Sequence, residues 1–388
     1  MFKSPKILFA APLAAAVAAA PALAVEPESI DLGSGVSVTP LLDLEVGYDD
    51  NIRGVGVGEE SSWVTRISPS VLLEALRGLN LYQLKYKADI NTYHSSQDDN
   101  HVNHKLEGLG TLVFDQRNRL TLSADYAETE QVANSRYAGI SDQFNTASVG
   151  AVYGFGVPAA TINLDAGIKH TWRRTDNAGG INDDREYDNL GLNGIVYYRI
   201  SPKTRVLAEY RYEEREYELS GSTLDNDRDI VLLGVTWDAT DKSVGTIKAG
   251  YEKRDFDDAS RGEISSSFWE LDFTWQPRPL STITVGTHKE SREGELTADY
   301  VETTSYDIAW NQRWTHRIHS DVFYGFLEED FVDQSRTDDI NRAGVRLNYD
   351  LLRQVTVGVG YTYYDRDSPL AIRDYDRNIY MLNVNFSL

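Results

Sequence analysis

About eighteen consecutive segments between residues 37 and 388 alternate apolar with polar side chains, and this pattern constrains the fold more than any other feature. From Leu79 onward, one face carries Tyr82, Leu84, Tyr86, Ala88 and Ile90, and the other carries Gln83, Lys85, Lys87, Asp89 and Asn91. The segments that begin at Ile162 and Val355 repeat the pattern. Because side chains of a β-strand point alternately to its two faces, each segment is predicted to be a strand with one apolar and one polar face.

The connections between these strands alternate in length. Short turns are expected at residues 77–78, 115–118, 156–159, 201–204, 240–243, 277–280, 316–317 and 352–354. Longer loops are expected near residues 50–60, 94–104, 128–142, 173–186, 215–228, 256–265, 290–302, 329–340 and 366–376. Nine loops and eight turns join eighteen strands, and outer-membrane barrels have short periplasmic turns and longer outer loops. The pattern predicts an all-β, antiparallel up-and-down transmembrane β-barrel in the outer membrane of a Gram-negative bacterium.

A soluble sandwich of two packed sheets would also have strands with one apolar face. Three features favour the barrel. The predicted strands are about 10–13 residues long, and tilted strands need about 9–11 residues to cross a bilayer. Aromatic residues gather at strand ends on the apolar face, as in interfacial girdles: Tyr210, Tyr212, Trp269, Trp275, Trp310, Trp314, Tyr361 and Tyr363. The polar faces carry charges that a wet lumen accepts: Glu209, Arg211, Glu213, Lys248, Glu252, Glu270, Asp272, Asp307, Arg313, Arg342 and Arg346.

The first 24 residues are predicted to be a cleavable export signal. Lys3 and Lys6 precede an apolar run, and Ala22-Leu23-Ala24 is a small-x-small cleavage site. We expect a short periplasmic segment at residues 25–36, too short for a plug domain, followed by one barrel domain at residues 37–388.

The last nine residues, 380–388, alternate apolar and polar side chains to the end of the chain. This segment resembles the C-terminal strand that outer-membrane assembly machinery recognises, although Leu388 stands where phenylalanine is commoner. It is expected to be the final barrel strand.

Composition and motifs limit which partners and activities the chain can have. The net charge of −22 excludes nucleic acid as a partner, because a phosphate backbone requires a positive patch. The chain has no cysteine, which suits an exported protein that folds without disulfides. Its seven histidines are scattered and no G-x-S-x-G motif is present. We expect no catalytic residues, no cofactor and no enzymatic activity.

The predicted outer loops are rich in acidic residues. The clusters are Asp49-Asp50, Asp98-Asp99, Asp183-Asp184, Asp225 and Asp227, Asp255, Asp257 and Asp258, Asp338-Asp339, and Asp374 and Asp376. Clustered carboxylates can hold calcium, but none of these has the EF-hand spacing. His101 and His104, near Asp98, form either a weak metal cluster or a polar loop. We expect solvated acidic loops and no metal site.

Alternation alone suggests which side chains line the lumen and set ion selectivity. The candidates are Lys85, Lys87, Asp89, Glu209, Arg211, Arg313 and Arg346. Rows of mixed charge also form ladders of ion pairs that narrow a pore without binding a substrate, and this structural interpretation is preferred. Phe323 and Tyr364 are the clearest inward aromatic residues.

The N-terminal part of the barrel resembles a known family. Thr39-Pro40 and Tyr48-Asp49-Asp50-Asn51-Ile52 frame a first strand similar to that of the Putative beta-barrel porin 2 family. The next hairpin, residues 67–73 and 86–93, is also similar. Members of this family are often associated with exopolysaccharide or capsule loci, so the resemblance implies an outer-membrane role in polysaccharide export.

Three functions remain open. The most specific is a porin-like channel for hydrophilic solutes that acts in exopolysaccharide export, with polysaccharide and periplasmic export components as partners. The second is a nutrient-uptake porin for small sugars or ions. The third is a closed structural or adhesive barrel that acts through its acidic loops. Outer-membrane lipid and lipopolysaccharide are expected to surround the barrel in each case, and the sequence identifies no subunit-contact face.

Overall fold

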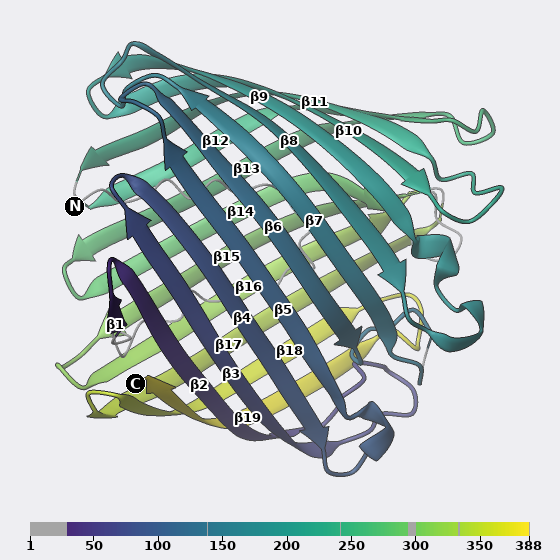
Figure 1. Ribbon diagram of the computed structural model, residues 1–388. Coiled ribbons are helices and arrows are strands. Elements are labelled where there is room, and N and C mark those ends of the chain that lie inside the picture. Colours follow the sequence, from purple (N-terminus) through teal and green to yellow (C-terminus); the bar gives the residue numbers. More distant parts are fainter. Residues whose placement is uncertain (1–28, 138, 241, 294–299, 333, 388) are drawn as a thin grey trace.

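The structure is a computed structural model that describes residues 29–387 apart from residues 138, 241, 294–299 and 333. The predicted export signal lies outside the described residues. Three short 3-10 helices occupy loops: η1 Gln97–Asp99, η2 Ala178–Gly180 and η3 Asp183–Arg185. The strands (Figure 1) are β1 Ile30–Gly33, β2 Val36–Asp49, β3 Ser62–Arg77, β4 Asn80–Tyr93, β5 His101–Val113, β6 Asn118–Gln131, β7 Asp142–Phe155, β8 Ile162–Thr175, β9 Tyr187–Ser201, β10 Thr204–Tyr217, β11 Asn226–Thr240, β12 Ser243–Phe256, β13 Glu263–Arg278, β14 Ser281–Glu293, β15 Tyr300–Arg313, β16 Ile318–Phe331, β17 Arg336–Leu352, β18 Val355–Asp367 and β19 Tyr375–Ser387.

The eighteen strands β2 to β19 form a closed barrel, which confirms the predicted fold class and strand number. Each strand pairs antiparallel with the next one along the chain. The last strand, β19, pairs with β2, with Tyr380 opposite Tyr48 and Leu382 opposite Val46. Closure lets neighbouring strands satisfy their backbone hydrogen bonds without water, as a bilayer interior requires. In the described part of the chain, no helix is long and apolar enough to span a membrane.

The two ends of the barrel differ, as the alternating connections predict. Figure 1 shows tight turns at one end and longer loops at the other. Three of the longer loops are L1 (residues 50–61), L3 (132–141) and L9 (368–374). By the rule for outer-membrane barrels, the long-loop end faces outward and the tight-turn end faces the periplasm.

A short hairpin precedes the barrel. The strand β1 pairs antiparallel with the start of β2, with Ile30 opposite Val38. Gly33, Ser34 and Gly35 turn the chain with positive φ angles of 84°, 56° and 75°. A side chain at Gly35 would place its Cβ 2.6 Å from the Leu76 carbonyl oxygen, so this turn requires glycine. Part of the segment predicted to precede the barrel is therefore an extension of its wall.

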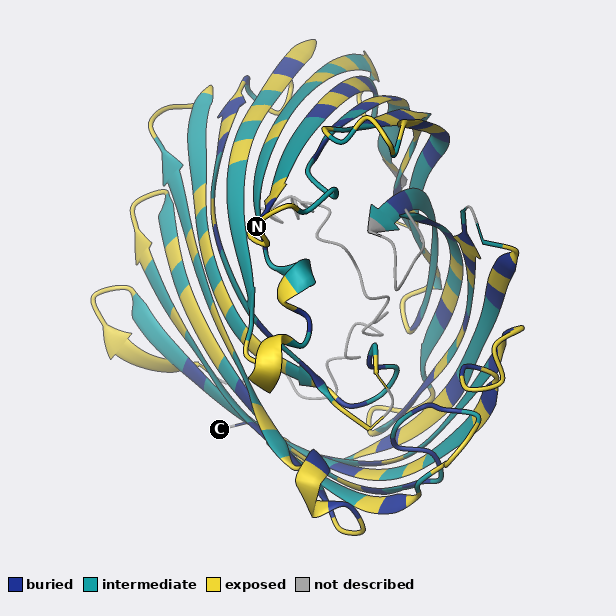
Figure 2. Ribbon diagram, turned by 90° about the vertical axis from the view of Figure 1, so that its right-hand side faces the viewer, coloured by how far each residue is buried: buried dark blue, intermediate teal, exposed yellow. Residues whose placement is uncertain are grey.

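Successive residues of a strand have opposite environments. On β11, Leu232 is fully buried and its neighbour Leu233 is 69% exposed. Bands of different exposure follow the strands in Figure 2, which views the barrel from its long-loop end. The exposed hydrophobic face is the one that meets lipid, so the bilayer rather than a second sheet covers it.

Aromatic residues on the lipid face orient their polar atoms along the sheet. Near the periplasmic end, the indole nitrogens of Trp310 and Trp314 donate to Ser281 Oγ at 3.0 Å and to Ser320 Oγ at 2.9 Å. Nearer the outer end, the hydroxyl of Tyr361 donates to Asn378 Oδ1 at 2.7 Å. Rings with a satisfied polar tip suit the membrane-water boundary, which agrees with the predicted girdles.

Candidate functional site: the charged lumen

One part of the lumen wall carries charged side chains that stay in contact with solvent. On β3, β4, β5 and β17, the side chains of Arg66, Lys85, Lys105 and Arg346 are 41%, 47%, 54% and 45% exposed. Each lies within 4.0 Å of a carboxylate, which is Glu45 for both arginines and Glu107 for both lysines. We call this part the open wall. Charged groups on an inner face keep such exposure only where the adjoining space admits water.

The opposite part of the wall holds a compact group of four charges, here called the lumen quartet. The Arg211 guanidinium donates to both oxygens of Glu270 at 2.8 and 3.0 Å and to Glu209 at 2.6 Å. The ammonium of Lys248 lies 2.8 Å from Glu209 and 3.1 Å from Glu270. Two cations face two anions, so the quartet is neutral. Such pairing compensates the desolvation of charges as buried as Glu209, which is 5% exposed.

A second charged row lies closer to the outer end. Arg228 on β11 contacts Glu252 at 2.5 Å, Glu213 at 3.3 Å and Glu290 at 3.6 Å. Glu252 is 1% exposed and Arg228 is 7% exposed. One arginine therefore serves three carboxylates, and this part of the wall is packed rather than solvated.

An apolar cluster separates the two charged rows. Ile230, Leu232 and Phe268 are almost fully buried and contact one another. The guanidinium groups of Arg211 and Arg228 lie 5.7 and 5.8 Å from the centre of the Phe268 ring, within cation–π range. The sequence prediction missed these inward apolar residues. The alternation that places Glu270 inward also places Phe268 inward. Ile230 and Leu232 alternate with equally apolar neighbours, so the sequence does not indicate which of these residues face the lumen.

A third group lies near the outer rim. Arg366 donates to Asp338 at 2.6 Å and to Glu329 at 2.9 Å. Arg336 donates to both oxygens of Asp338 at 2.9 and 2.5 Å and lies 3.7 Å above the Phe331 ring. Asp338 is fully buried as a result.

The prediction of solvated acidic loops is wrong for one acid in each of three clusters. Asp99 is 6% exposed and accepts a hydrogen bond from Arg53 at 3.1 Å. Asp338 lies on β17, where two arginines surround it. Asp49 is 4% exposed at the end of β2 and accepts hydrogen bonds from Arg377 at 2.6 to 3.2 Å. Asp258 does lie in an exposed loop, where hydrogen bonds from Ser260 lower the pKa of its carboxyl. Arg366 and Arg377 are remote in sequence from the acids that they contact, so local patterns do not reveal them, whereas Arg336 lies two residues from Asp338.

The two histidines near Asp98 do not form a shared site. The His101 ring lies 2.8 Å from the backbone oxygen of Asp99. The His104 ring contacts the hydroxyl of Tyr86 at 2.9 Å, and Tyr86 belongs to the lipid face. Within residues 29–137, 139–240, 242–293, 300–332 and 334–387, no three His, Asp or Glu side chains are grouped for metal binding.

The sheet opens between β13 and β14 in its outer half. These strands pair only from Trp269 opposite Lys289 to Arg278 opposite Ser281, and no described residue of β13 before Trp269 pairs with β14. Side chains of β12 form hydrogen bonds with the outer end of β14, where the backbone hydrogen bonds between β13 and β14 are missing. Glu252 accepts from the backbone nitrogen of Ser291 at 2.6 Å, and Arg254 donates to the backbone oxygen of Ser291 at 3.3 Å. The outer end of β14 therefore lies over the lumen face of β12, an arrangement with no signal in the sequence.

Three loops interlock at the outer mouth. The Arg373 guanidinium of L9 donates to the Ser135 carbonyl oxygen of L3 at 3.0 Å, and Tyr375, which follows L9, donates to Asn134 at 3.0 Å. The Gly56 amide of L1 donates to the Ile372 carbonyl oxygen of L9 at 3.0 Å. L1, L3 and L9 are thus joined to one another at the long-loop end of the barrel, the end that faces the viewer in Figure 2.

The predicted lumen residues fall into separate groups. Lys87 and Asp89 form a local pair at 2.8 Å on β4, and Lys85 lies beside them on the same face. Glu209 and Arg211 belong to the lumen quartet. Arg313 lies at the periplasmic end of β15, where it donates to Asp350 at 3.3 Å. Arg346 lies on the open wall. The structure does not bring the seven into one ring, and their role in ion selectivity stays a prediction.

The predicted inward aromatic residues both contact arginines. Arg342 lies 4.9 Å from the Phe323 ring and Arg377 lies 5.7 Å from the Tyr364 ring. An arginine lies over each ring, so the two residues do not form an aromatic path for sugars.

A solved structure shares this barrel fold. OccAB4 of Acinetobacter baumannii superposes with a TM-score of 0.52 at 14% identity, over 92% of this chain and 98% of that chain. OpdK of Pseudomonas aeruginosa gives a TM-score of 0.47 at 13% identity, over 90% and 98%. The FrpB iron transporter of Neisseria meningitidis (F3-3 variant) gives 0.48 at 11% identity, over 85% of this chain and 62% of that chain, so this chain spans less than two thirds of FrpB. No curated protein sequence matches the chain.

A family model identifies the family to which the chain belongs. The model described as Putative beta-barrel porin 2 matches residues 25–388, which include the whole barrel and the motif at residues 39–52. The structure adds a closed eighteen-stranded wall with a lipid face and a charged inner face. The chain therefore belongs to the Putative beta-barrel porin 2 family and is a porin-like barrel of the outer membrane.

Proposed function

We propose that this protein is a diffusion channel for hydrophilic solutes, and that its cargo is an exopolysaccharide under export. The open wall carries the channel part of the proposal. Lys85, Lys105 and Arg346 each keep about half of their side chain exposed, so a hydrated solute could exchange contacts with water for contacts with these groups. Barrels of about 16–18 strands are wide enough to leave an aqueous channel.

The ion pairs favour passage over tight binding. Each exposed cation of the open wall has a carboxylate partner, so the wall presents paired charges rather than a strong field of one sign. Conduction requires contacts that are favourable enough for entry and weak enough for release. The lumen quartet makes its part of the wall rigid, and the solute passes along the open wall.

Family membership supports the export part of the proposal. Members of the Putative beta-barrel porin 2 family are often associated with exopolysaccharide or capsule loci, where they are taken as outer-membrane components of export. A nutrient-uptake porin would use the same lumen in the opposite direction. Glycosyltransferase genes beside this gene would favour export, and an uptake transporter would favour the alternative.

One observation favours a closed barrel instead. L1, L3 and L9 are joined by hydrogen bonds between Arg373 and Ser135, between Tyr375 and Asn134, and between Gly56 and Ile372. If these loops seal the mouth, the protein would act through its outer surface. Permeability separates this function from both channel functions.

The test combines permeability and cellular phenotype. Refolded protein in liposomes is expected to give swelling in raffinose, with rates that fall as oligosaccharide size rises. Deletion of the gene is expected to trap polymer in the periplasm, and the intact gene should restore secretion. Swelling without trapped polymer would leave a channel and reject export, whereas no swelling in any sugar would reject the channel.

A further inference from the structure

One arginine of the inner wall lies between aromatic rings and has no polar partner. The guanidinium carbon of Arg173 on β8 lies 3.8 Å from the centre of the Phe144 ring and 5.9 Å from that of Tyr187. Both rings are buried in the wall. In the described part of the chain, this guanidinium has no hydrogen-bond acceptor, and no carboxylate lies within 4.0 Å of it. None of its nitrogens is buried without a partner, so they reach the water of the lumen.

Other arginines that lie over rings on the inner wall contact an acid. Arg185 lies 4.7 Å from the same Phe144 ring, and it contacts Asp142 at 3.0 Å. The same combination of a ring and an acid holds three more arginines, which are Arg211 with Glu270, Arg336 with Asp338 and Arg377 with Asp49. Stacking on a ring fixes the plane of a guanidinium. Arg173 therefore presents a fixed row of donors to which no described residue is bound.

A row of neutral polar side chains lies next to Arg173 on its periplasmic side. Because side chains alternate along a strand, Thr171 shares the inner face with Arg173. The register places Thr171 between Ser148 of β7 and Asn189 of β9. Two hydroxyls and one amide thus lie side by side across three strands.

A second cation follows one row further along β8. Lys169 shares the inner face with Thr171, and the register places it between Gly150 and Gly191. Neither glycine adds a side chain beside the lysine. We call the inner face of β7 to β9 at the rows of Arg173, Thr171 and Lys169 the β8 strip. These three rows contain no Asp or Glu.

The carboxylates that border the β8 strip have partners. Asp125 on β6 accepts a hydrogen bond from Ser148 Oγ at 3.2 Å. Three more are in ion pairs, which are Asp142 with Arg185, Asp165 with Arg119 and Glu213 with Arg228. The strip itself holds two cations and no carboxylate, and it is therefore a positive part of a chain with a net charge of −22.

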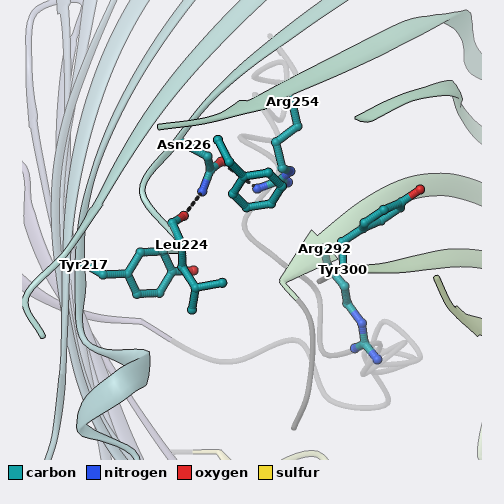
Figure 3. A pocket seen from close by; sticks show the side chains of 7 residues that line it. Tyr217, Leu224, Asn226, Arg254, Arg292 and Tyr300 are labelled. Carbon is teal, nitrogen blue, oxygen red and sulfur yellow. Dashed lines mark hydrogen bonds between the residues drawn. The ribbon is translucent and has the colours of Figure 1, made fainter. Parts of the chain in front are cut away.

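The wall beside the strip is packed and leaves no room for a solute. Tyr217 of β10 meets the Tyr187 ring edge to face, with the ring centres 5.7 Å apart. Figure 3 shows Tyr217 in a cluster with Arg254 and Tyr300, around a space of about 10 Å³. A space of that size holds about one water molecule. A solute can therefore contact the β8 strip from the lumen but cannot enter the wall next to it.

The side chains of the strip match an acidic saccharide. A planar guanidinium binds the two oxygens of a carboxylate in a bidentate arrangement. The Thr171 hydroxyl and the Asn189 amide can form hydrogen bonds with sugar hydroxyls. Lys169 lies four residues from Arg173, about 13 Å along a strand that rises about 3.3 Å per residue. One carboxylate cannot span that distance, so Lys169 would contact an acidic group on another unit of the same saccharide.

We propose that Arg173, Thr171, Asn189 and Lys169 form a binding strip for an oligosaccharide that carries carboxylates on more than one unit. The inference rests on the proposed function, because it takes the cargo to be a saccharide, and it adds that the cargo is acidic. One carboxylate lies against Arg173, the sugar hydroxyls contact the neutral row, and a second carboxylate lies near Lys169. The strip gives an acidic saccharide a favourable contact inside a barrel whose outer loops are themselves acidic.

Equilibrium binding tests the strip without any need for conductance. Titration calorimetry of the refolded mature protein in detergent is expected to show binding of trigalacturonate and much weaker binding of its methyl ester, which has the same rings without the charges. Arg173→Gln is expected to weaken trigalacturonate binding by about tenfold or more, since hydrogen bonds between charged groups are lost. Lys169→Gln should weaken it several-fold. Arg117→Gln removes the same charge from an exposed periplasmic turn and should bind as the wild type does.

A conservative variant and a simple anion complete the test. Arg173→Lys keeps the charge but loses the planar fork, and it should bind trigalacturonate several-fold more weakly while gel mobility shows a folded barrel. Should Arg173→Gln fail to fold, this variant decides the question. Equal affinity of the wild type for the acid and its ester, or wild-type affinity in folded Arg173 variants, would overturn the strip. Binding of sodium sulfate as tightly as trigalacturonate would overturn the saccharide assignment.

The channel and the strip can fail separately. Conductance with no preference for trigalacturonate over its ester would reject the strip and keep the channel. Binding that depends on Arg173 in a protein that does not conduct would keep the strip and reject the channel.

Discussion

Arg211 and Glu270 lie three strands apart in the barrel order, on β10 and β13, and two parallel hydrogen bonds of 2.8 and 3.0 Å join them. The pair reaches along the inner surface, past β11 and β12, because the wall curves toward the lumen. Lys248 and Glu209 complete a neutral group at the same place. This relationship explains how a membrane barrel keeps charges buried in its wall.

Removal of one partner should destabilise the barrel. Glu270→Gln leaves Arg211 and Lys248 with one carboxylate fewer in a buried site, and the expected loss of unfolding free energy is about 3–5 kcal/mol. Urea unfolding from lipid vesicles, followed by tryptophan fluorescence, measures it. Lys105→Gln on the open wall serves as the control and should cost less than about 1 kcal/mol. Equal losses for the two variants would show that the quartet is not a buried network.

Ion selectivity should respond to the exposed arginine more than to the buried one. Arg346 is 45% exposed on its side chain, whereas Arg211 is 8% exposed and already neutralised. Charge reversal at Arg211, Arg313 and Arg346 together should raise the cation-to-anion permeability ratio by roughly twofold or more. Arg346→Glu alone should produce most of that change. Reversal potentials in a KCl gradient measure both variants, and an unchanged ratio in the triple variant would reject the predicted selectivity residues.

L1 and L9 should separate when a side chain is added at Gly56, where the two loops are in contact. A Cβ at Gly56 would lie 1.9 Å from the backbone oxygen of Asp374 and 2.4 Å from that of Ala371, so Gly56→Ala forces the loops to separate. We expect faster cleavage of L9 by protease and a larger or noisier single-channel current. Gly194→Ala is the matched control, since no atom lies within 4 Å of its added Cβ. Identical behaviour of the two variants would show that the L1–L9 contact does not hold the mouth.

The opening between β13 and β14 predicts uneven protection of backbone amides. Residues 264–268 pair with β12 but not with β14, whereas residues 271–275 pair on both sides. Hydrogen exchange in nanodiscs should therefore be faster for a peptide over 264–268 than for one over 271–275, because unpaired amides open more easily. The corresponding peptides of β12, whose residues 245–255 pair on both sides, provide the reference. Equal protection along β13 would contradict the opening.

The sequence predicts the structure of the barrel wall well, because the face that a strand residue occupies depends on local alternation. Alternation over a strand decides which residues meet lipid, so Leu84 and Tyr86 could be assigned to a face before any partner was known. The inward position of Glu209 and Arg211 follows from the same parity. The strand count follows from turns and loops, which are also local signals.

The interior could not be predicted in the same way. Asp338 looks like a loop acid in sequence, but Arg336 and Arg366 bury it once the strands pair. The contact of Arg373 with Ser135 joins residues 238 positions apart. Arg254 donates to Asn226 and Ser291, which lie 28 and 37 positions away in the sequence. Those relationships depend on curvature and on the departure of β14 from β13, which no periodic pattern encodes.

The barrel is expected to conduct hydrophilic solutes through a lumen bounded by the open wall. The most direct measurement is single-channel current of the refolded mature protein in a planar bilayer, with oligosaccharides added afterwards as blockers. We expect a steady ohmic conductance that saccharides reduce in a concentration-dependent way. Absence of any conductance, in protein shown to be folded and inserted, would contradict it and would favour a barrel that acts through its outer loops.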